Sequence, residues 1–179
     1  VYKRQLLGWT SGRGVLRELG AGLVGYLAGL PLLVGAAIIT IVIVMVRQAM
    51  QKASGEPVTT PDNPIFDFVS KGSPLGLFLL FTLATLWAPL VEESVFRGAF
   101  YRHLRSRLHF VFAAIVSAVA FGVMHGYDFL LLLPVMSLGV TFALMREWRG
   151  SLIAPMFAHC LHNATILTLV LTALSILKD

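Results

Sequence analysis

The sequence predicts an all-α fold, a polytopic bundle of transmembrane helices around a buried polar active-site cavity. Two observations favour this fold class over a soluble one. Apolar residues make up 57% of the 179 residues and charged residues only 13%, whereas soluble domains average about 25% charged residues. The few charged and imidazole side chains within apolar segments recur on several of those segments. The chain therefore has too few charged residues for a water-exposed surface. Its polar side chains within the apolar segments must face the interior of a helix bundle.

Five apolar segments approach or exceed the roughly 20 residues that a helix needs to cross a bilayer. They cover residues 19–46, 74–102, 110–124, 129–145 and 151–177. The third is the shortest and fits a helix that is buried among others or ends beside a polar site. Residues 52–73 form a polar loop that contains three prolines, with a short interfacial helix expected at residues 65–69. We therefore expect two parts: residues 1–73, with a basic N-terminal segment, the first transmembrane helix and this loop, and residues 74–179, with a core of about four transmembrane helices.

Basic residues predict the orientation of the helices. Three segments would share one side of the membrane if all five helices cross it, and their basic residues are Lys3, Arg4, Arg13, Arg17, Arg102, Arg105, Arg107, Arg146 and Arg149. The opposite side carries Arg47, Lys52 and Lys71, balanced by Glu56, Asp62 and Asp67. The positive-inside rule places the first set in the cytoplasm.

The net charge of +5 and the single cysteine, Cys160, exclude several kinds of function. The basic residues flank apolar segments, where they meet anionic lipid headgroups, and no basic patch is interleaved with aromatic residues. We therefore expect membrane lipids and no nucleic acid as partners. One cysteine excludes an internal disulfide and a cysteine-rich metal site.

Three charged residues lie within the second apolar segment, in the stretch LWAPLVEESVFRG. A charge at the centre of a transmembrane helix costs about 2.5–3.5 kcal/mol on insertion scales, so such residues are functional by default. Arg97 follows Glu93 by four residues, so the two share a helix face and can pair. Glu92 points about 100° away and is free for another role.

Two further segments carry polar side chains to a similar depth. His125 ends the third segment, and His159 and Asn163 lie four residues apart on one face of the fifth. At 1.5 Å per residue, these side chains and Glu92 lie roughly 13–22 Å from the cytoplasmic ends of their helices. A glutamate beside a histidine can deprotonate a water, and imidazole and amide groups can donate hydrogen bonds to an oxyanion. This is the minimum set for peptide-bond hydrolysis.

The strings EESVFRG, FGVMH and HCLHN resemble the three motifs of the CPBP (CAAX protease and bacteriocin-processing) intramembrane protease family, which includes the type II CAAX prenyl endopeptidases. The family pattern is Glu-Glu-x-x-x-Arg, Phe-x-x-x-His and His-x-x-x-Asn. All three motifs occur in this order within residues 75–174, and each lies in an apolar segment. The resemblance identifies residues 74–179 as a CPBP-like protease core.

The resemblance implies a glutamate-dependent endopeptidase that acts on a membrane-bound or lipidated peptide or protein. It implies that Glu92 and His125 activate the water, while His159 and Asn163 donate to the oxyanion.

The resemblance further implies that Glu93 and Arg97 support this geometry. Glu and two His can ligate zinc, but the chain lacks the helical His-Glu-x-x-His pair, so we expect no metal cofactor.

Three other functions stay open at the level of the sequence. The first is a zinc-dependent form of the same hydrolysis. The second is a non-catalytic membrane scaffold or immunity protein with the protease fold. The third is a proton-coupled transporter, which the absence of a visible inverted repeat disfavours. We expect an integral, multi-pass protein of a prokaryotic plasma membrane, because the third and fourth segments are short.

Overall fold

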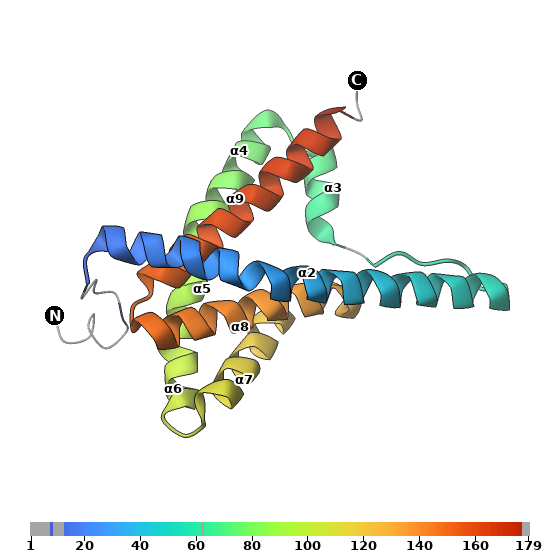
Figure 1. Cartoon of the computed structure of the whole chain (residues 1–179). Coiled ribbons are helices and arrows are strands. Elements are labelled where there is room, and N and C mark those ends of the chain that lie inside the picture. Colours follow the sequence, from blue (N-terminus) through green and yellow to red (C-terminus); the bar gives the residue numbers. More distant parts are fainter. Residues whose placement is uncertain (1–7, 9–12, 62, 177–179) are drawn as a thin grey trace.

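The computed structural model describes residues 8, 13–61 and 63–176, and within these ranges the chain forms helices and no strand (Figure 1). This confirms the all-α class. The elements are α2 (Val15–Ser54), α3 (Pro64–Lys71), α4 (Pro74–Thr82), η1 (Leu83–Trp87), α5 (Ala88–Glu93), η2 (Ser94–Phe100), α6 (Tyr101–Arg105), α7 (Phe110–Val123), η3 (Phe129–Leu131), α8 (Leu132–Arg149) and α9 (Ile153–Ile176).

Four of the described helices are long and apolar enough to cross a membrane, where the sequence predicted five. They are Val15–Ser54, Pro74–Arg105, Phe129–Arg149 and Ile153–Ile176. The segment predicted at residues 110–124 forms α7, a helix of only 14 residues. Its length of about 21 Å falls short of the roughly 30 Å hydrocarbon layer. The chain is thus an integral membrane protein, and α7 packs against α8 rather than adding a fifth helix of full length.

Helix α2 lies beside α8 and crosses α9 (Figure 1), and these contacts join the N-terminal helix to the rest of the bundle. Small residues make the close approach possible. A Cβ added at Gly25 would collide with the side chain of Met145, and one at Gly29 would collide with Thr141. Glycine at these two positions therefore allows α2 to lie directly on α8. The C-terminal end of α2 continues past the bundle (Figure 1).

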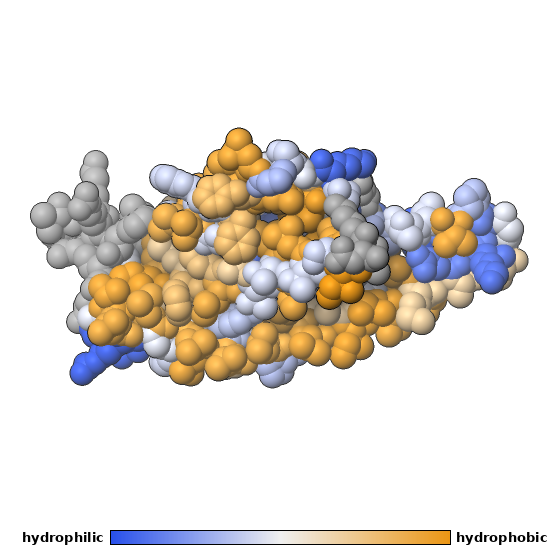
Figure 2. Space-filling view, turned by 90° about the horizontal axis from the view of Figure 1, so that it is seen from above, coloured by the Kyte–Doolittle hydropathy of each residue, from blue (hydrophilic) through white to orange (hydrophobic). Residues whose placement is uncertain are grey.

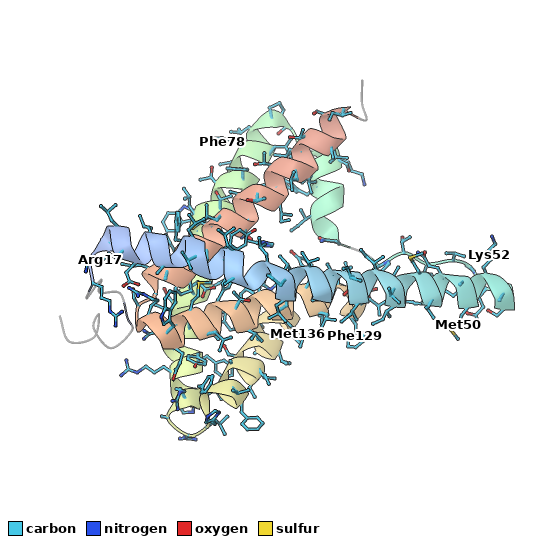
Figure 3. The ribbon with its side chains drawn as sticks, in the orientation of Figure 1. Arg17, Met50, Lys52, Phe78, Phe129 and Met136 are labelled. Atoms are coloured by element: carbon cyan, nitrogen blue, oxygen red, sulfur yellow. The ribbon has the colours of Figure 1, made fainter. Side chains whose placement is uncertain are left out.

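Large apolar side chains cover the outside of the helices, as expected for a protein surrounded by lipid. Figure 2 shows a mainly apolar face, with paler residues across its middle and the most hydrophilic residues at its edges. In Figure 3, Phe78 and Phe129 extend away from the bundle, and they are 66% and 80% exposed. A soluble monomer rarely exposes such a large contiguous apolar area.

The basic segments predicted to share one side lie at one end of the bundle. Arg149 at the end of α8 donates to Glu18 in the first turn of α2, with a distance of 2.7 Å between Nη2 and Oε1. Arg105 at the end of α6 pairs with Glu147 of α8 at 3.0 Å. The two pairs join the ends of all three segments. The predicted basic residues Lys3 and Arg4, together with Asp62 and the expected helix end at Leu177, lie outside the described residues.

The polar loop contains the expected short helix, α3. Asn63 precedes it, and its side-chain oxygen accepts a hydrogen bond from the backbone N–H of Ile65 at 3.0 Å. Proline occupies the first turn, where its missing N–H has no cost. These local signals explain why the helix begins where it does.

Candidate active site

Two π-helical segments, η1 and η2, flank α5, the short helix that carries both glutamates. Pro89 accounts for part of this irregularity. In a π-helix, each N–H donates to the carbonyl five residues earlier, as the N–H of Ala88 does to the carbonyl of Leu83. The corresponding donor for the carbonyl of Ala84 would be residue 89, but this residue is proline and has no N–H. The Nδ2 of Asn163 donates to this carbonyl at 2.7 Å. Asn163 therefore ties α9 to the segment just before the glutamates.

Glu93 and Arg97 form the ion pair that their spacing predicted. The Nη1 of Arg97 lies 2.9 Å from the Oε1 of Glu93, and both side chains are 0% exposed. The Nη2 of Arg97 donates to the carbonyl of Gly139 in α8 at 3.0 Å. The guanidinium also lies over the ring of Phe121, 4.3 Å from its centroid. A buried charge needs partners of this kind, since an unpaired one would be strongly destabilising.

Glu92 points the other way, as its position in the helix predicted, and meets two histidines from other elements. Its Oε2 lies 4.0 Å from the Nε2 of His125 and 3.9 Å from the Nε2 of His159. This oxygen is buried and has no hydrogen-bond partner among the described residues, although 29% of the Glu92 side chain is exposed. The Oε2 of Glu92 and the two Nε2 atoms thus converge, but the distances from Oε2 to each nitrogen are too long for a direct hydrogen bond.

The opposite nitrogen of each histidine has its own acceptor. The Nδ1 of His125 lies 2.7 Å from the carbonyl of Phe121, and the Nδ1 of His159 lies 3.0 Å from the Oε1 of Glu93. A carbonyl or an ionised carboxylate can only accept, so both Nδ1 atoms carry hydrogen. When the rings are neutral, both Nε2 atoms are therefore unprotonated and face Glu92.

Aromatic rings hold the imidazoles in place. Phe142 stacks on His159 with centroids 5.0 Å apart and planes 24° apart. Phe121 lies edge-on to His125 at 4.6 Å, and Tyr127 lies on another side of His125 at 5.5 Å. Packing of this kind fixes the ring orientations on which the chemistry depends.

Glu92, His125, His159 and Asn163 line one cavity of about 350 Å³. The predicted catalytic residues thus share a single space, and the supporting pair, Glu93 and Arg97, is fully buried behind it. Much of the remaining lining is apolar and includes Leu80, Val135, Leu138, Ile166, Leu167 and Val170. The cavity therefore combines a polar end with an apolar wall.

Two lining residues were not predicted as part of the site. They are Tyr127 and His162, which both line the cavity. Burial raises the pKa of the Tyr127 hydroxyl, and the Glu92 carboxylate raises it further, so the phenol stays protonated near neutral pH. His162 lies 3.4 Å from the hydroxyl of Tyr26 in α2. In the sequence, only the position of Tyr127 in the turn directly after His125 indicates that it could reach the site. No sequence pattern indicates the contact between Tyr26 and His162.

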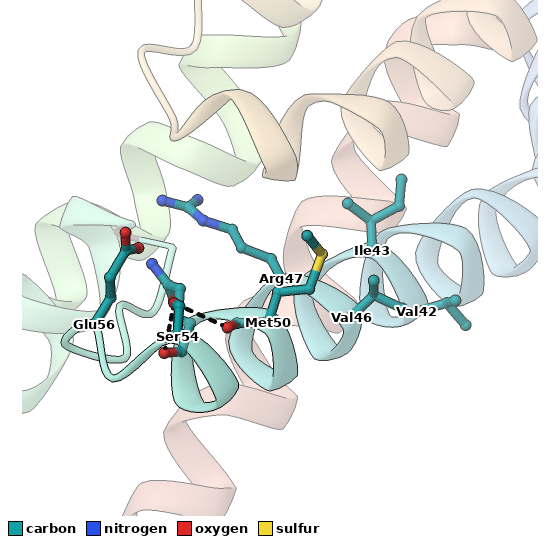
Figure 4. A pocket seen from close by; sticks show the side chains of 8 residues that line it. Val42, Ile43, Val46, Arg47, Met50, Ser54 and Glu56 are labelled. Atoms are coloured by element: carbon teal, nitrogen blue, oxygen red, sulfur yellow. Dashed lines mark hydrogen bonds between the residues drawn. The ribbon is translucent and has the colours of Figure 1, made fainter.

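A larger cavity of about 680 Å³ lies along the protruding end of α2 and contains none of these residues (Figure 4). Its wall is formed by Val42, Ile43, Val46, Arg47, Met50, Gln51, Ser54 and Glu56. It lacks the convergent acid and imidazole groups of the smaller cavity. The chemistry of the site, rather than cavity size, distinguishes the two.

Among the residues that the structure describes, no group of three or more His, Cys, Asp or Glu side chains is arranged to hold a metal ion.

Fold and site together define an integral membrane protein with an acid–imidazole cavity between its helices. Residues 74–165, about half of the chain, match the family model described as type II CAAX prenyl endopeptidase Rce1-like. The chain therefore belongs to this family, which confirms the resemblance seen in the three motifs. All six predicted site residues fall within the matched range.

A curated relative gives the same indication. The chain is 30% identical over 93 residues to the Bacillus subtilis (strain 168) protein named "Putative membrane peptidase YdiL". The match covers 52% of this chain and 38% of the relative, so the chain spans well under half of that protein's length. No solved structure matches the chain.

Proposed function

We propose that the protein is an intramembrane endopeptidase that hydrolyses a peptide bond of a membrane-associated or lipidated substrate. The convergence of Glu92 with His125 and His159, from three separate elements, supports this proposal most directly. Membership of the endopeptidase family supports the same reaction class. We further propose that the protein resides in a prokaryotic plasma membrane, with its basic end in the cytoplasm.

Water activation follows from the two acceptors that face each other. A water with hydrogen bonds of about 2.8 Å can bridge acceptors roughly 4 Å apart, close to the 4.0 Å between Glu92 Oε2 and His125 Nε2. Its hydrogens would point to these two atoms, and a lone pair would face the cavity. Glu92 then takes the proton as the oxygen attacks the scissile carbonyl.

Oxyanion stabilisation is assigned to His159 and Asn163. Because the Nδ1–H of His159 is engaged by Glu93, His159 can donate from Nε2 only when the ring carries both protons. The Nδ1 of His159 lies 3.0 Å from the Oε1 of Glu93, and its Nε2 lies 3.9 Å from the Oε2 of Glu92. Asn163 donates one amide hydrogen to Ala84 and retains a second N–H for the substrate.

The shape of the cavity supports a lipidated or apolar substrate segment. Its apolar wall continues from the polar end along α8 and α9, through Val135 and Leu167. An extended peptide with an attached lipid chain could place its scissile bond at Glu92 and its apolar part against this wall. Comparing membrane-peptide profiles of cells that carry the wild type or Glu92→Ala tests the proposal. Peptides that accumulate uncleaved only in the variant support it, and identical profiles favour a non-catalytic scaffold or immunity role.

Asn163→Ala is expected to lower kcat by about 10²-fold or more, as loss of one oxyanion donor usually does, with a small change in KM. The substitution also leaves the carbonyl of Ala84 without its donor, so the melting temperature should fall modestly. Steady-state kinetics and thermal unfolding of the same preparation separate the two effects. A lower melting temperature with unchanged kcat would assign Asn163 to helix packing alone.

Treatment with 1,10-phenanthroline is expected to leave the cleavage rate within about twofold, because Glu92 and His125 activate the water without a cation in this mechanism. The rate is measured before and after chelation, and again after addition of Zn²⁺. A loss of activity that Zn²⁺ restores would instead favour the zinc-dependent form, with Glu92, His125 and His159 as the ligand set to test.

A further inference from the structure

Two arginines at the basic end of the bundle form no ion pair among the described residues: Arg102 on α6 and Arg146 on α8. Both line a small cavity of about 220 Å³, outside the proposed active site. The cavity also contains Glu147, but its two carboxylate oxygens are already engaged. Oε1 lies 3.0 Å from Nε of Arg105, and Oε2 accepts from the hydroxyl of Tyr101 at 2.9 Å.

Arg146 is held in a defined position. Its Nε donates to the backbone carbonyl of Arg97 at 3.4 Å. The backbone of Gly8 lies so close to the guanidinium that a Cβ there would come within 2.7 Å of its Cζ. Among the described residues, the terminal nitrogens of Arg146 form no hydrogen bond and no ion pair. Within the described part of the chain, the guanidinium is thus positioned but not ion-paired.

Arg102 and Arg146 line the same small cavity. Two like charges around one small cavity repel, and an anion between them would relieve that repulsion. Guanidinium groups bind phosphate particularly well, because their N–H groups match the geometry of its oxygens. The two arginines lie near the ends of the helices Pro74–Arg105 and Phe129–Arg149, where lipid headgroups are found.

We propose that Arg102 and Arg146 form a binding site for a phosphate group, supplied by the headgroup of an anionic phospholipid. Free inorganic phosphate has the same chemistry and is the alternative source. A lipid bound here would join the ends of α6 and α8, and Phe142 of α8 stacks on His159. The site does not depend on the proposed protease activity.

Native mass spectrometry of the full chain in detergent tests the site, with phosphatidylglycerol, phosphatidylcholine and inorganic phosphate as separate probes. Arg102→Gln and Arg146→Gln are compared with Arg107→Gln, which removes the same charge from an exposed residue outside the cavity. Each site substitution should raise the Kd for phosphatidylglycerol about fivefold or more, as expected from the loss of one lipid-facing arginine. Arg107→Gln should change it less than about twofold.

The other outcomes also decide the question. Equal weakening by Arg102→Gln and Arg107→Gln would overturn the site and leave only general attraction to the basic end. Binding of inorganic phosphate as tight as that of phosphatidylglycerol would overturn the lipid source. If Arg146→Gln does not fold, the exposed Arg102 carries the test alone, since it has no side-chain hydrogen bond or ion pair to lose among the residues that the structure describes.

Discussion

Glu92→Gln is expected to lower the rate of peptide-bond cleavage by about 10³-fold or more, because an amide cannot take a proton from the attacking water. The substitution keeps the size of the side chain. The Oε2 of Glu92 makes no hydrogen bond that the change would break. The variant should therefore insert and unfold like the wild type. Initial rates on a quenched fluorescent lipopeptide in proteoliposomes, together with melting temperatures, measure both properties.

Glu56→Gln is the matched control, since Glu56 is exposed and lies at the distant cavity on α2. It removes the same charge and should leave the cleavage rate within about twofold. His125→Ala should fail as Glu92→Gln does, because it removes the second acceptor for the water. Near-normal turnover of either active-site variant would show that another group acts as the base.

Arg97→Met is expected to destabilise the protein by about 3–5 kcal/mol, the usual cost of removing one partner from a buried ion pair. Glu93 would stay fully buried with its charge no longer compensated, and the carbonyl of Gly139 would lose its donor. Folded yield in detergent and the midpoint of chemical unfolding should both fall. Activity should fall as well, because Glu93 orients His159.

Arg105→Met provides the comparison within the same chain. It breaks the ion pair between Arg105 and Glu147, whose side chains are 41% and 34% exposed, respectively. The loss of stability should therefore stay below about 1 kcal/mol. Similar losses for Arg97→Met and Arg105→Met, or an unchanged unfolding midpoint for Arg97→Met, would argue against a supporting role for the buried pair.

Helix spacing was sufficient to predict several features of the site. The separation of four residues between Glu93 and Arg97 predicted their pair, and the adjacent position of Glu92 predicted that it faces elsewhere. Helix geometry is regular over such short distances, so local contacts follow from residue spacing. Spacing was less informative over a whole segment. Residues 110–124 have the composition of a membrane helix, but the helix they form is too short to cross.

Contacts between helices could not be predicted in this way. The bond from Asn163 to the carbonyl of Ala84, the contact between Tyr26 and His162, and the place of Tyr127 beside His125 all join residues through packing. Arg146, which forms no ion pair within the described ranges, is a further case, because only the fold shows that Glu147 is already engaged by other residues.

The sequence by itself predicted that this protein lies in a membrane, which family it belongs to and which side chains form its candidate site. Composition, apolar length and motif spacing are properties of the chain alone. Only the tertiary structure decided which atoms of those side chains meet, which nitrogen of each histidine faces Glu92 and how many helices are long enough to cross. These depend on how helices distant in sequence pack, and small residues such as Gly25 permit that packing without specifying its final geometry.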